Sequence, residues 1–149
     1  MNTQQIIDLE NQYLAPTYGR PGIVLDRGSG NYLYDLDGNR YLDFIGGIAV
    51  NSLGHAVPEI IGAVSKQAAK LMHVSNLYHT APHAILAELL VENAFPSKVF
   101  FCNSGSEAIE AALKFSRRWA FGEGGDEKHE IISFENSFHG RTYGAISAT

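Results

Sequence analysis

Small and polar residues at positions 103–106 (N-S-G-S) stand where an apolar run ends and a helical pattern begins at once. Ser104 and Glu107 have the S-x-x-E spacing of a capping box, which satisfies main-chain amides at the start of a helix. The same junction would also suit an anion. The amides of Gly105 and Ser106, the Ser106 hydroxyl and the helix dipole all favour a phosphate there. The turn has neither the G-K-[ST] of a P-loop nor the G-x-G-x-x-G of a dinucleotide site.

The carboxylate of Glu107 opposes the phosphate interpretation, because it would repel a second negative charge. We therefore expect a phosphate at this turn only if the Glu107 side chain is turned away from it. Taken by itself, the S-x-x-E pattern favours simple helix capping, since capped helices are common.

A second group of candidate residues lies at positions 135–142, in the segment ENSFHGRT. Phe138 and His139 place two aromatic rings in a loop, and Gly140 permits a tight turn. Arg141 offers a fork-shaped donor that suits a carboxylate. Alone, Phe138 could be a core aromatic and Arg141 a surface charge. Together with the anion turn, they predict a phosphorylated aromatic cofactor and a carboxylate substrate.

Alternating strands and helices are expected to bring these two motifs to one edge of a sheet. Buried strands are predicted at residues 98–103 and 130–136, each directly before one of the motifs. Helices are predicted at residues 58–74, 81–95, 106–121 and 140–149. This order is typical of an α/β fold, in which ligands bind at the carboxyl edge of a parallel sheet.

The first part of the chain has a different character. Residues 3–14 predict a short amphipathic helix, and residues 23–44 predict three short antiparallel strands separated by Gly- and Asn-containing turns. We expect residues 1–55 to be an N-terminal segment of a small domain and residues 56–149 to be the first part of a large domain. Two parallel strands are too few for a complete sheet, so we expect the N-terminal portion of a larger protein.

The composition narrows the class of protein. The sequence is 45% hydrophobic with a net charge of −5 and no basic cluster, so we expect neither disorder nor a nucleic-acid partner. The single cysteine excludes an internal disulfide, and no Cys/His spacing indicates a metal site. The N-terminus lacks a signal-peptide pattern, and no apolar run is long enough to span a bilayer. We therefore expect a cytoplasmic protein without a membrane partner.

Several longer stretches carry a family resemblance. The segments NSGSEAIEAALK and SFHGRT together resemble the class III aminotransferases, which use pyridoxal 5'-phosphate on the fold type I scaffold. The segments YLDFIGGIAVNSLGH, SNLYHT and FFCNSGSEAIEAALKFSR resemble the acetylornithine aminotransferases within that class. The resemblance extends through most of the chain, and it implies an incomplete fold type I transferase.

The resemblance also implies roles for individual residues. Gly105 and Ser106 would bind the phosphate of the cofactor, Phe138 would stack on one face of its pyridine ring, and His139 would flank it. Arg141 would hold the α-carboxylate of the substrate.

Two further regions are implicated by the resemblance alone. Tyr18, in TYGRP, matches a tyrosine that lines the substrate pocket, although an ordinary packed loop tyrosine is an equal alternative. The loop around Ser75 and Asn76 would approach the active site of the other subunit in a homodimer.

The reaction implied is transfer of an amino group from N-acetylornithine to 2-oxoglutarate in arginine biosynthesis, with ornithine, succinylornithine and 4-aminobutyrate as alternative donors. Family members hold the pyridoxal on a lysine that lies downstream of this region. None of the lysines here matches that motif: Lys66, Lys70, Lys98, Lys114 and Lys128. We therefore expect no catalytic residue in this chain and no activity of the chain alone. A noncatalytic phosphate- or nucleotide-binding module, or a structural fragment that pairs with a full-length subunit, remains open.

Overall fold

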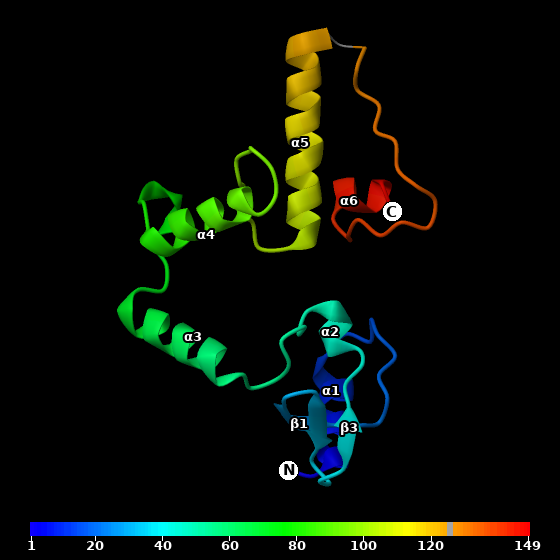
Figure 1. The fold of residues 1–149 in the computed structure, drawn as a ribbon. Coiled ribbons are helices and arrows are strands. Elements are labelled where there is room, and N and C mark those ends of the chain that lie inside the picture. The colour runs from blue at the N-terminus through cyan, green and yellow to red at the C-terminus, as the bar shows by residue number, and fades with distance from the viewer. Residues whose placement is uncertain (125–126) are drawn as a thin grey trace. The chain divides into compact units, whose positions relative to one another are not determined.

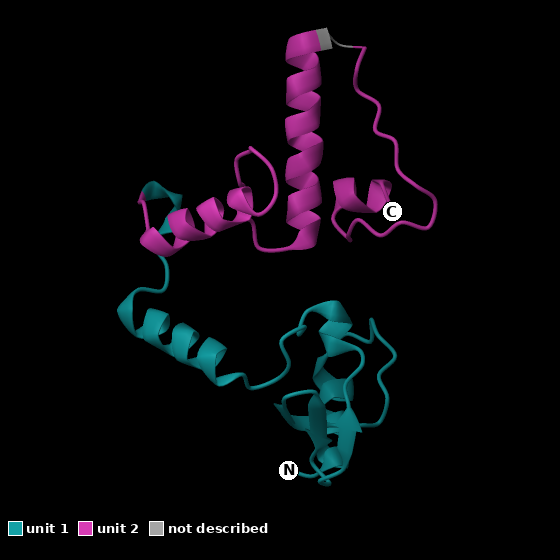
Figure 2. Ribbon diagram, in the orientation of Figure 1, with its two compact units in different colours: residues 1–77 teal, residues 78–149 magenta. Residues whose placement is uncertain are grey.

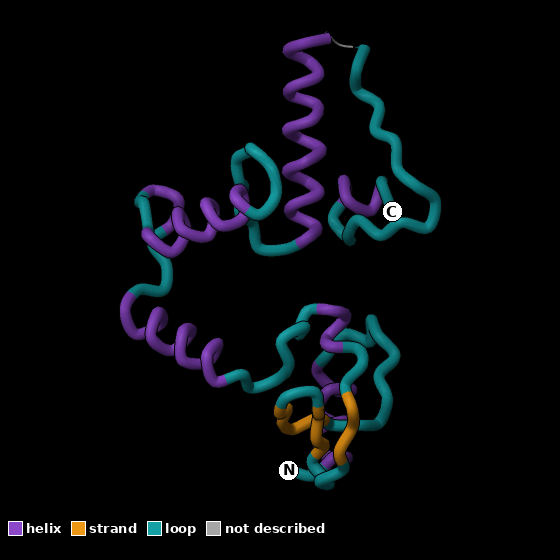
Figure 3. The backbone as a smooth tube through the Cα atoms, viewed as in Figure 1, coloured by secondary structure: helices purple, strands orange, loops and turns teal. Residues whose placement is uncertain are grey.

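The structure is a computed structural model, and it describes residues 1–124 and 127–149. The chain divides into two compact units, Met1–Leu77 and Tyr78–Thr149, which Figure 2 colours separately. Among the described residues, strands occur only in the first unit, whereas both units contain helices (Figure 3). The expected domain division between residues 55 and 56 stays a prediction.

The first unit contains a three-stranded antiparallel sheet in the order β1-β2-β3. The strands are β1 (Leu25–Ser29), β2 (Tyr32–Asp35) and β3 (Arg40–Leu42). Figure 1 labels the two outer strands, β1 and β3. The register pairs Ser29 with Tyr32 and Tyr32 with Leu42. The meander that the sequence predicts over residues 23–44 is therefore confirmed.

Asp35 fixes the turn between β2 and β3. Its Oδ1 accepts hydrogen bonds from the main-chain amides of Asp37 (3.0 Å) and Asn39 (2.8 Å). Its Oδ2 accepts from the Asn39 side chain at 2.9 Å and from the Tyr41 hydroxyl at 2.7 Å. The Asn39 side-chain amide, followed by the Tyr41 hydroxyl, holds the pKa of Asp35 below its usual value because both stabilise the ionised form.

The right-handed helices of the first unit are close to those predicted. Helix α1 (Thr3–Tyr13) begins at a capping box in which Asn2 and Gln5 bond each other's main-chain amides, at 2.9 and 3.0 Å. Helix α3 (Pro58–Lys70) begins with proline and ends four residues before the predicted boundary at residue 74. It ends there because Leu71 is extended, with its carbonyl accepting from the Gln67 side chain at 2.8 Å. A 3-10 turn, η1, follows at Ser75–Leu77.

The short helix α2 (Gly46–Ala49) has the opposite hand. The φ angles of Gly46, Gly47, Ile48 and Ala49 are 54°, 65°, 64° and 61°. Left-handed backbone is unfavourable for residues that carry a Cβ atom, so this segment must be held by its surroundings. The sequence pattern predicts a glycine-containing connection here and no helix.

Asp43 and His55 supply that support. Asp43 Oδ1 accepts hydrogen bonds from the amides of Ile45 (3.0 Å) and Gly46 (2.8 Å), while its Oδ2 lies 2.7 Å from His55 Nε2. His55 is itself joined to Gly30 by two main-chain hydrogen bonds of 2.8 and 3.0 Å. The segment between Asp43 and His55 is thus fastened at both ends.

The second unit contains three helices within its described residues. They are α4 (Ala81–Glu92), α5 (Gly105–Gly124) and α6 (Tyr143–Ser147), and α5 and α6 are in contact. Helix α4 ends before the predicted boundary at residue 95, because the Asn93 side chain caps it by donating to the Leu89 carbonyl at 2.8 Å. The helices predicted at 106–121 and within 140–149 are confirmed as α5 and α6.

The two parallel strands predicted for the second unit are not formed. Residues 98–103 and 130–136 belong to no strand in the described structure and appear as loop in Figure 3. A strand needs a partner for its amides and carbonyls, and no described segment pairs with either. Phe100 instead packs edge-on against Phe115 of α5, with ring centroids 5.5 Å apart. The strand prediction is therefore wrong for the structure of this chain.

Few side chains are buried among the described residues. Ala145 and Ala148 are the buried apolar residues, and Asp35 is the buried polar one. Large apolar side chains in the segment after α5 remain exposed, with Ile132 at 95% and Phe134 at 88%. The side chains of the candidate site are consequently held in place largely by hydrogen bonds between short segments. No helix in the described part of the chain is long and apolar enough to cross a membrane.

Candidate anion-binding site

Helix α5 begins with a cap that the sequence predicted. The Glu107 amide donates to Ser104 Oγ at 3.2 Å, and the Ala108 amide donates to the Ser104 carbonyl at 3.0 Å. The carboxylate of Glu107 reaches back to Asn103, where its Oε2 accepts from the main-chain amide (2.7 Å) and from Nδ2 (3.0 Å). The capping interpretation of Ser104 is confirmed. The Glu107 side chain reaches back as a capping box requires, but it binds Asn103, the residue before Ser104.

This cap leaves the next two amides of the turn available. In the described structure, the main-chain amides of Gly105 and Ser106 have no hydrogen-bond acceptor. Gly105 is exposed and Ser106 is half-buried. Because two donors of Asn103 bind the Glu107 carboxylate, that charge is held on the Asn103 side of the turn. The donor set therefore fits a phosphate, with the helix dipole adding about 0.3–1 kcal/mol.

The loop after residue 136 presents an exposed aromatic ring. Phe138 is 71% exposed, and the guanidinium carbon of Arg141 lies 5.7 Å from the centre of its ring. The main-chain amide of His139 donates to Thr149 Oγ1 at 3.1 Å, and its Nδ1 lies 3.3 Å from Ser137 Oγ. The flat ring and the guanidinium thus lie together, as a site for an aromatic group and an anion requires.

A hydrogen bond joins this loop to the turn. The main-chain amide of Arg141 donates to Ser106 Oγ at 3.3 Å. Gly140 makes the approach possible: its φ is 134°, and a Cβ atom there would collide with Ser106 Oγ. Of the residues predicted to form a site, Gly105, Ser106 and the 138–141 loop are therefore brought together in one unit.

A second contact, which the sequence does not predict, lies one turn along α5. Glu110 Oε1 accepts hydrogen bonds from Thr142 Oγ1 (2.5 Å), the Gly144 amide (2.8 Å) and the Ala145 amide (3.2 Å). The Thr142 hydroxyl, followed by the Ala145 amide, holds the pKa of Glu110 below its usual value. The one sequence signal was the spacing of Ser106 and Glu110, which places both on one helix face.

Tyr18 belongs to the first unit, whereas the other candidate residues belong to the second. It lies in the first unit, between α1 and β1, and its side chain is 56% exposed. Its role in a substrate pocket stays a prediction.

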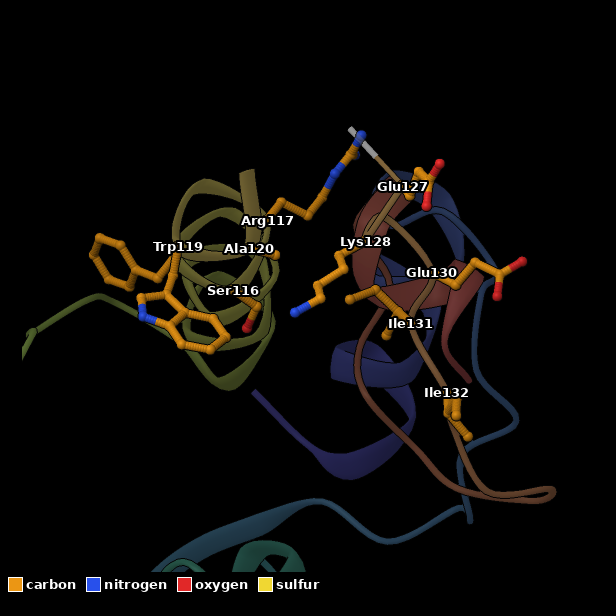
Figure 4. A pocket seen from close by; sticks show the side chains of 10 residues that line it. Ser116, Arg117, Trp119, Ala120, Glu127, Lys128, Glu130, Ile131 and Ile132 are labelled. Carbon is orange, nitrogen blue, oxygen red and sulfur yellow. The ribbon is translucent and has the colours of Figure 1, made fainter. Parts of the chain in front are cut away.

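A cavity of about 770 Å³ lies in the second unit at a different place (Figure 4). It is bounded by the later part of α5, including Ser116 and Trp119, and by residues 127–132, from which Lys128 extends toward α5. None of the predicted site residues lines it. The described residues also contain no group of three or more His, Cys, Asp or Glu side chains that could hold a metal ion.

The profile of the family described as Aminotransferase class-III matches residues 13–149. The chain belongs to this family. The class III aminotransferases depend on pyridoxal phosphate, so the predicted cofactor class agrees with the family. The match includes both the turn at the start of α5 and the 138–141 loop.

Curated relatives agree with that assignment. The chain is 52% identical to an acetylornithine aminotransferase of Clostridium acetobutylicum over 141 residues, which cover 95% of this chain and 36% of the relative. It is 48% identical to an acetylornithine aminotransferase of Methanocaldococcus jannaschii over 149 residues, covering all of this chain and 37% of the relative. The chain thus spans a little over a third of the length of these relatives.

Solved structures define the fold. An adenosylmethionine-8-amino-7-oxononanoate aminotransferase from Methanocaldococcus jannaschii matches 99% of this chain and 36% of its own, with a TM-score of 0.91 and 32% identity. An N-acetylornithine aminotransferase from Stenotrophomonas maltophilia matches 90% of this chain and 36% of its own, with a TM-score of 0.78 and 41% identity. The fold class is therefore that of part of a fold type I transferase, as the family resemblance implies.

Proposed function

We propose that this chain supplies the phosphate-binding turn and the substrate-carboxylate residue of a pyridoxal-phosphate-dependent aminotransferase. The proposed reaction moves an amino group from N-acetylornithine to 2-oxoglutarate in arginine biosynthesis. The observation that carries the proposal is identity of about half the residues, over nearly the whole chain, with relatives named acetylornithine aminotransferase.

The cofactor's phosphate is proposed to bind at the turn before α5. Gly105 and Ser106 offer two amides without an acceptor in the described structure, and the competing Glu107 carboxylate is bound to Asn103. Phe138 is proposed to lie against the pyridine ring, since its own ring is 71% exposed, with His139 beside it. When bound, pyridoxal phosphate supplies an electron sink for the bond changes at the amino-bearing carbon.

Arg141 is proposed to bind the α-carboxylate of the amino donor. Its guanidinium can present two parallel N–H groups to a carboxylate, which fixes orientation as well as binding the charge. Its main-chain amide donates to Ser106 Oγ, which joins the proposed carboxylate-binding residue to the proposed phosphate-binding turn. Tyr18 is proposed to bind the substrate, because TYGRP resembles a segment whose tyrosine lines the substrate pocket in related enzymes.

The chain alone is proposed to be inactive, because none of its five lysines matches the lysine motif of the family. The proposal also includes a homodimer in the cytoplasm, with the loop around Ser75 and Asn76 contributing to the partner's site. Amino-acid and 2-oxo-acid substrates are the expected small-molecule partners, with neither nucleic acid nor membrane involved.

A chimera tests the activity directly. Residues 1–149 replace the matching region of the Clostridium acetobutylicum relative, and glutamate formation from 2-oxoglutarate is measured with N-acetylornithine, ornithine, succinylornithine and 4-aminobutyrate. The proposal predicts the highest kcat/KM with N-acetylornithine, and a large loss in the Arg141→Lys chimera. A folded chimera that turned over none of the donors, or preferred 4-aminobutyrate, would contradict it. The 149-residue chain by itself is assayed alongside and is expected to show no transfer.

A further inference from the structure

Two side chains on one face of α5 hold the segment that carries the candidate site. Ser106 and Glu110 are four residues apart, so both point to the same side of the helix. Ser106 Oγ accepts from the amide of Arg141, and Glu110 Oε1 accepts from Thr142, Gly144 and Ala145. These bonds link α5 to a segment more than 30 residues away, and they leave the ring of Phe138 exposed.

We infer that Glu110 is a positioning residue, which docks residues 142–145 on α5 and so places Phe138 and Arg141 beside the turn at Gly105 and Ser106. The inference rests on the proposed function, because the turn and the loop matter together only if one ligand contacts both. Glu110 itself has no contact with the ligand in this scheme.

An ionised carboxylate strengthens this contact. One oxygen accepts from a hydroxyl and two main-chain amides, and a negative acceptor makes each of these bonds stronger than a neutral one. The positive charge of Lys114, one turn further along α5, also favours the ionised form. Glycine at position 144 leaves room for the carboxylate, because a Cβ atom there would collide with Glu110 Oε2. Glutamine keeps an acceptor oxygen without the charge, whereas alanine removes both.

The docking contact is tested first, in the 149-residue chain without any ligand. The amide signals and hydrogen-exchange rates of Gly144 and Ala145 are measured by NMR in Glu110→Ala, Glu110→Gln and the matched control Glu123→Gln, an exposed glutamate of the same helix. Exchange at both amides should rise by about tenfold in Glu110→Ala and less in Glu110→Gln. It should stay unchanged in Glu123→Gln. Unchanged exchange in Glu110→Ala would overturn the inference.

Positioning is tested separately with pyridoxamine 5'-phosphate, which carries the phosphate but no aldehyde to react with surface lysines. Its affinity should fall by about tenfold in Glu110→Ala, with partial recovery in Glu110→Gln. Thr142→Val attacks the same contact from the loop side without touching α5, and should weaken binding, while Thr142→Ser restores it. Pyridoxamine without the phosphate should bind the parent chain far more weakly.

The outcomes separate the two proposals. If Glu110→Ala loosens Gly144 and Ala145 but pyridoxamine 5'-phosphate binds as tightly as before, Glu110 has only a structural role and the inference fails. If the parent chain does not distinguish the phosphorylated from the unphosphorylated compound, the phosphate turn of the proposed function fails, and the positioning role fails with it. The exchange measurement then still decides whether the docking contact exists.

Discussion

Asp43 Oδ2 lies 2.7 Å from Nε2 of His55, and this pair closes the segment that contains the left-handed helix α2. The other oxygen of Asp43 accepts from the amides of Ile45 and Gly46 at the start of that segment. One carboxylate therefore fastens both ends of a segment of irregular backbone to the three-stranded sheet, so its ionisation should control the order of the segment.

The stability of this segment should depend on acid pH. The hydrogen bond from His55, followed by that from the Gly46 amide, holds the pKa of Asp43 below its usual 3.8. A carboxyl whose pKa is depressed on folding stabilises the fold above its unfolded pKa, and that stabilisation is lost as pH falls through the folded pKa. An NMR titration of the Asp43 carboxyl carbon between about pH 5 and pH 2 should give a midpoint below 3.8.

The partner variant makes this titration specific. His55→Ala removes the largest cause of the shift, so the midpoint of Asp43 should move back toward 3.8. The carboxyl of Asp35, which has its own partners in the β2–β3 turn, serves as the internal control and should keep its depressed midpoint. If the Asp43 midpoint is the same in His55→Ala as in the parent chain, His55 is not the main cause of the lowered pKa of Asp43.

Removing the cap of α5 should shorten that helix from its first turn. Ser104→Ala deletes the acceptor for the Glu107 amide and should lower stability by about 1 kcal/mol. Ser116→Ala is the matched control, because the Ser116 hydroxyl bonds the Ala112 carbonyl inside the helix and alanine favours helix formation. Circular dichroism and thermal unfolding should show a loss in the first variant and no loss in the second. Equal losses would mean that Ser104 is not acting as a cap.

Gly140 should tolerate no side chain. Gly140→Ala adds a Cβ atom that meets Ser106 Oγ at a φ of 134°, so the loop should detach from α5 at a cost of about 1–3 kcal/mol. Gly122→Ala, inside α5 with no atom within 4 Å of the added Cβ, should instead raise stability by about 0.5–1 kcal/mol. Opposite shifts in the unfolding midpoint are the expected result, and a neutral Gly140→Ala would contradict the contact between Gly140 and Ser106.

Phe138 should contribute to ligand affinity and little to folding. Because its side chain is 71% exposed, Phe138→Ala should change stability by less than about 0.5 kcal/mol. The affinity of the Phe138→Ala chain for pyridoxamine 5'-phosphate should nevertheless fall several-fold, because ring stacking is lost. Phe134→Ala, which removes another exposed ring four residues earlier, should leave that affinity unchanged. If both variants change the affinity equally, Phe138 does not contact the ligand.

Local sequence patterns predicted the local structure well. Alternation and turn residues indicated the β1–β3 meander, proline indicated the start of α3, and S-x-x-E indicated the cap of α5, because each pattern acts within a few residues. The strands expected at 98–103 and 130–136 failed for the converse reason. A parallel strand depends on partners distant in sequence, which an apolar run cannot specify.

The same distinction applies to the candidate site. Gly105 and Ser106 could be proposed from the turn and Arg141 from the second motif, because amides, a hydroxyl and a guanidinium suit anions. Phe138 could be proposed because a flat ring suits an aromatic group. Glu110 could not be proposed, since its contact with Gly144 is formed only after folding. The sequence likewise indicated a tight turn at Gly140 without revealing that Ser106 lies against it.

The left-handed helix α2 reverses the usual preference between mirror-image amino acids. At Ile48 and Ala49, φ is 64° and 61°. An L-residue is disfavoured there by about 1–2 kcal/mol, whereas its D-enantiomer favours this conformation. A semisynthetic chain with D-alanine at position 49 should therefore be more stable than the natural one, whereas the same exchange within α1 should break that helix. L-residues favour right-handed backbone along most of the chain, and α2 is a short segment in which D-residues would be favoured instead.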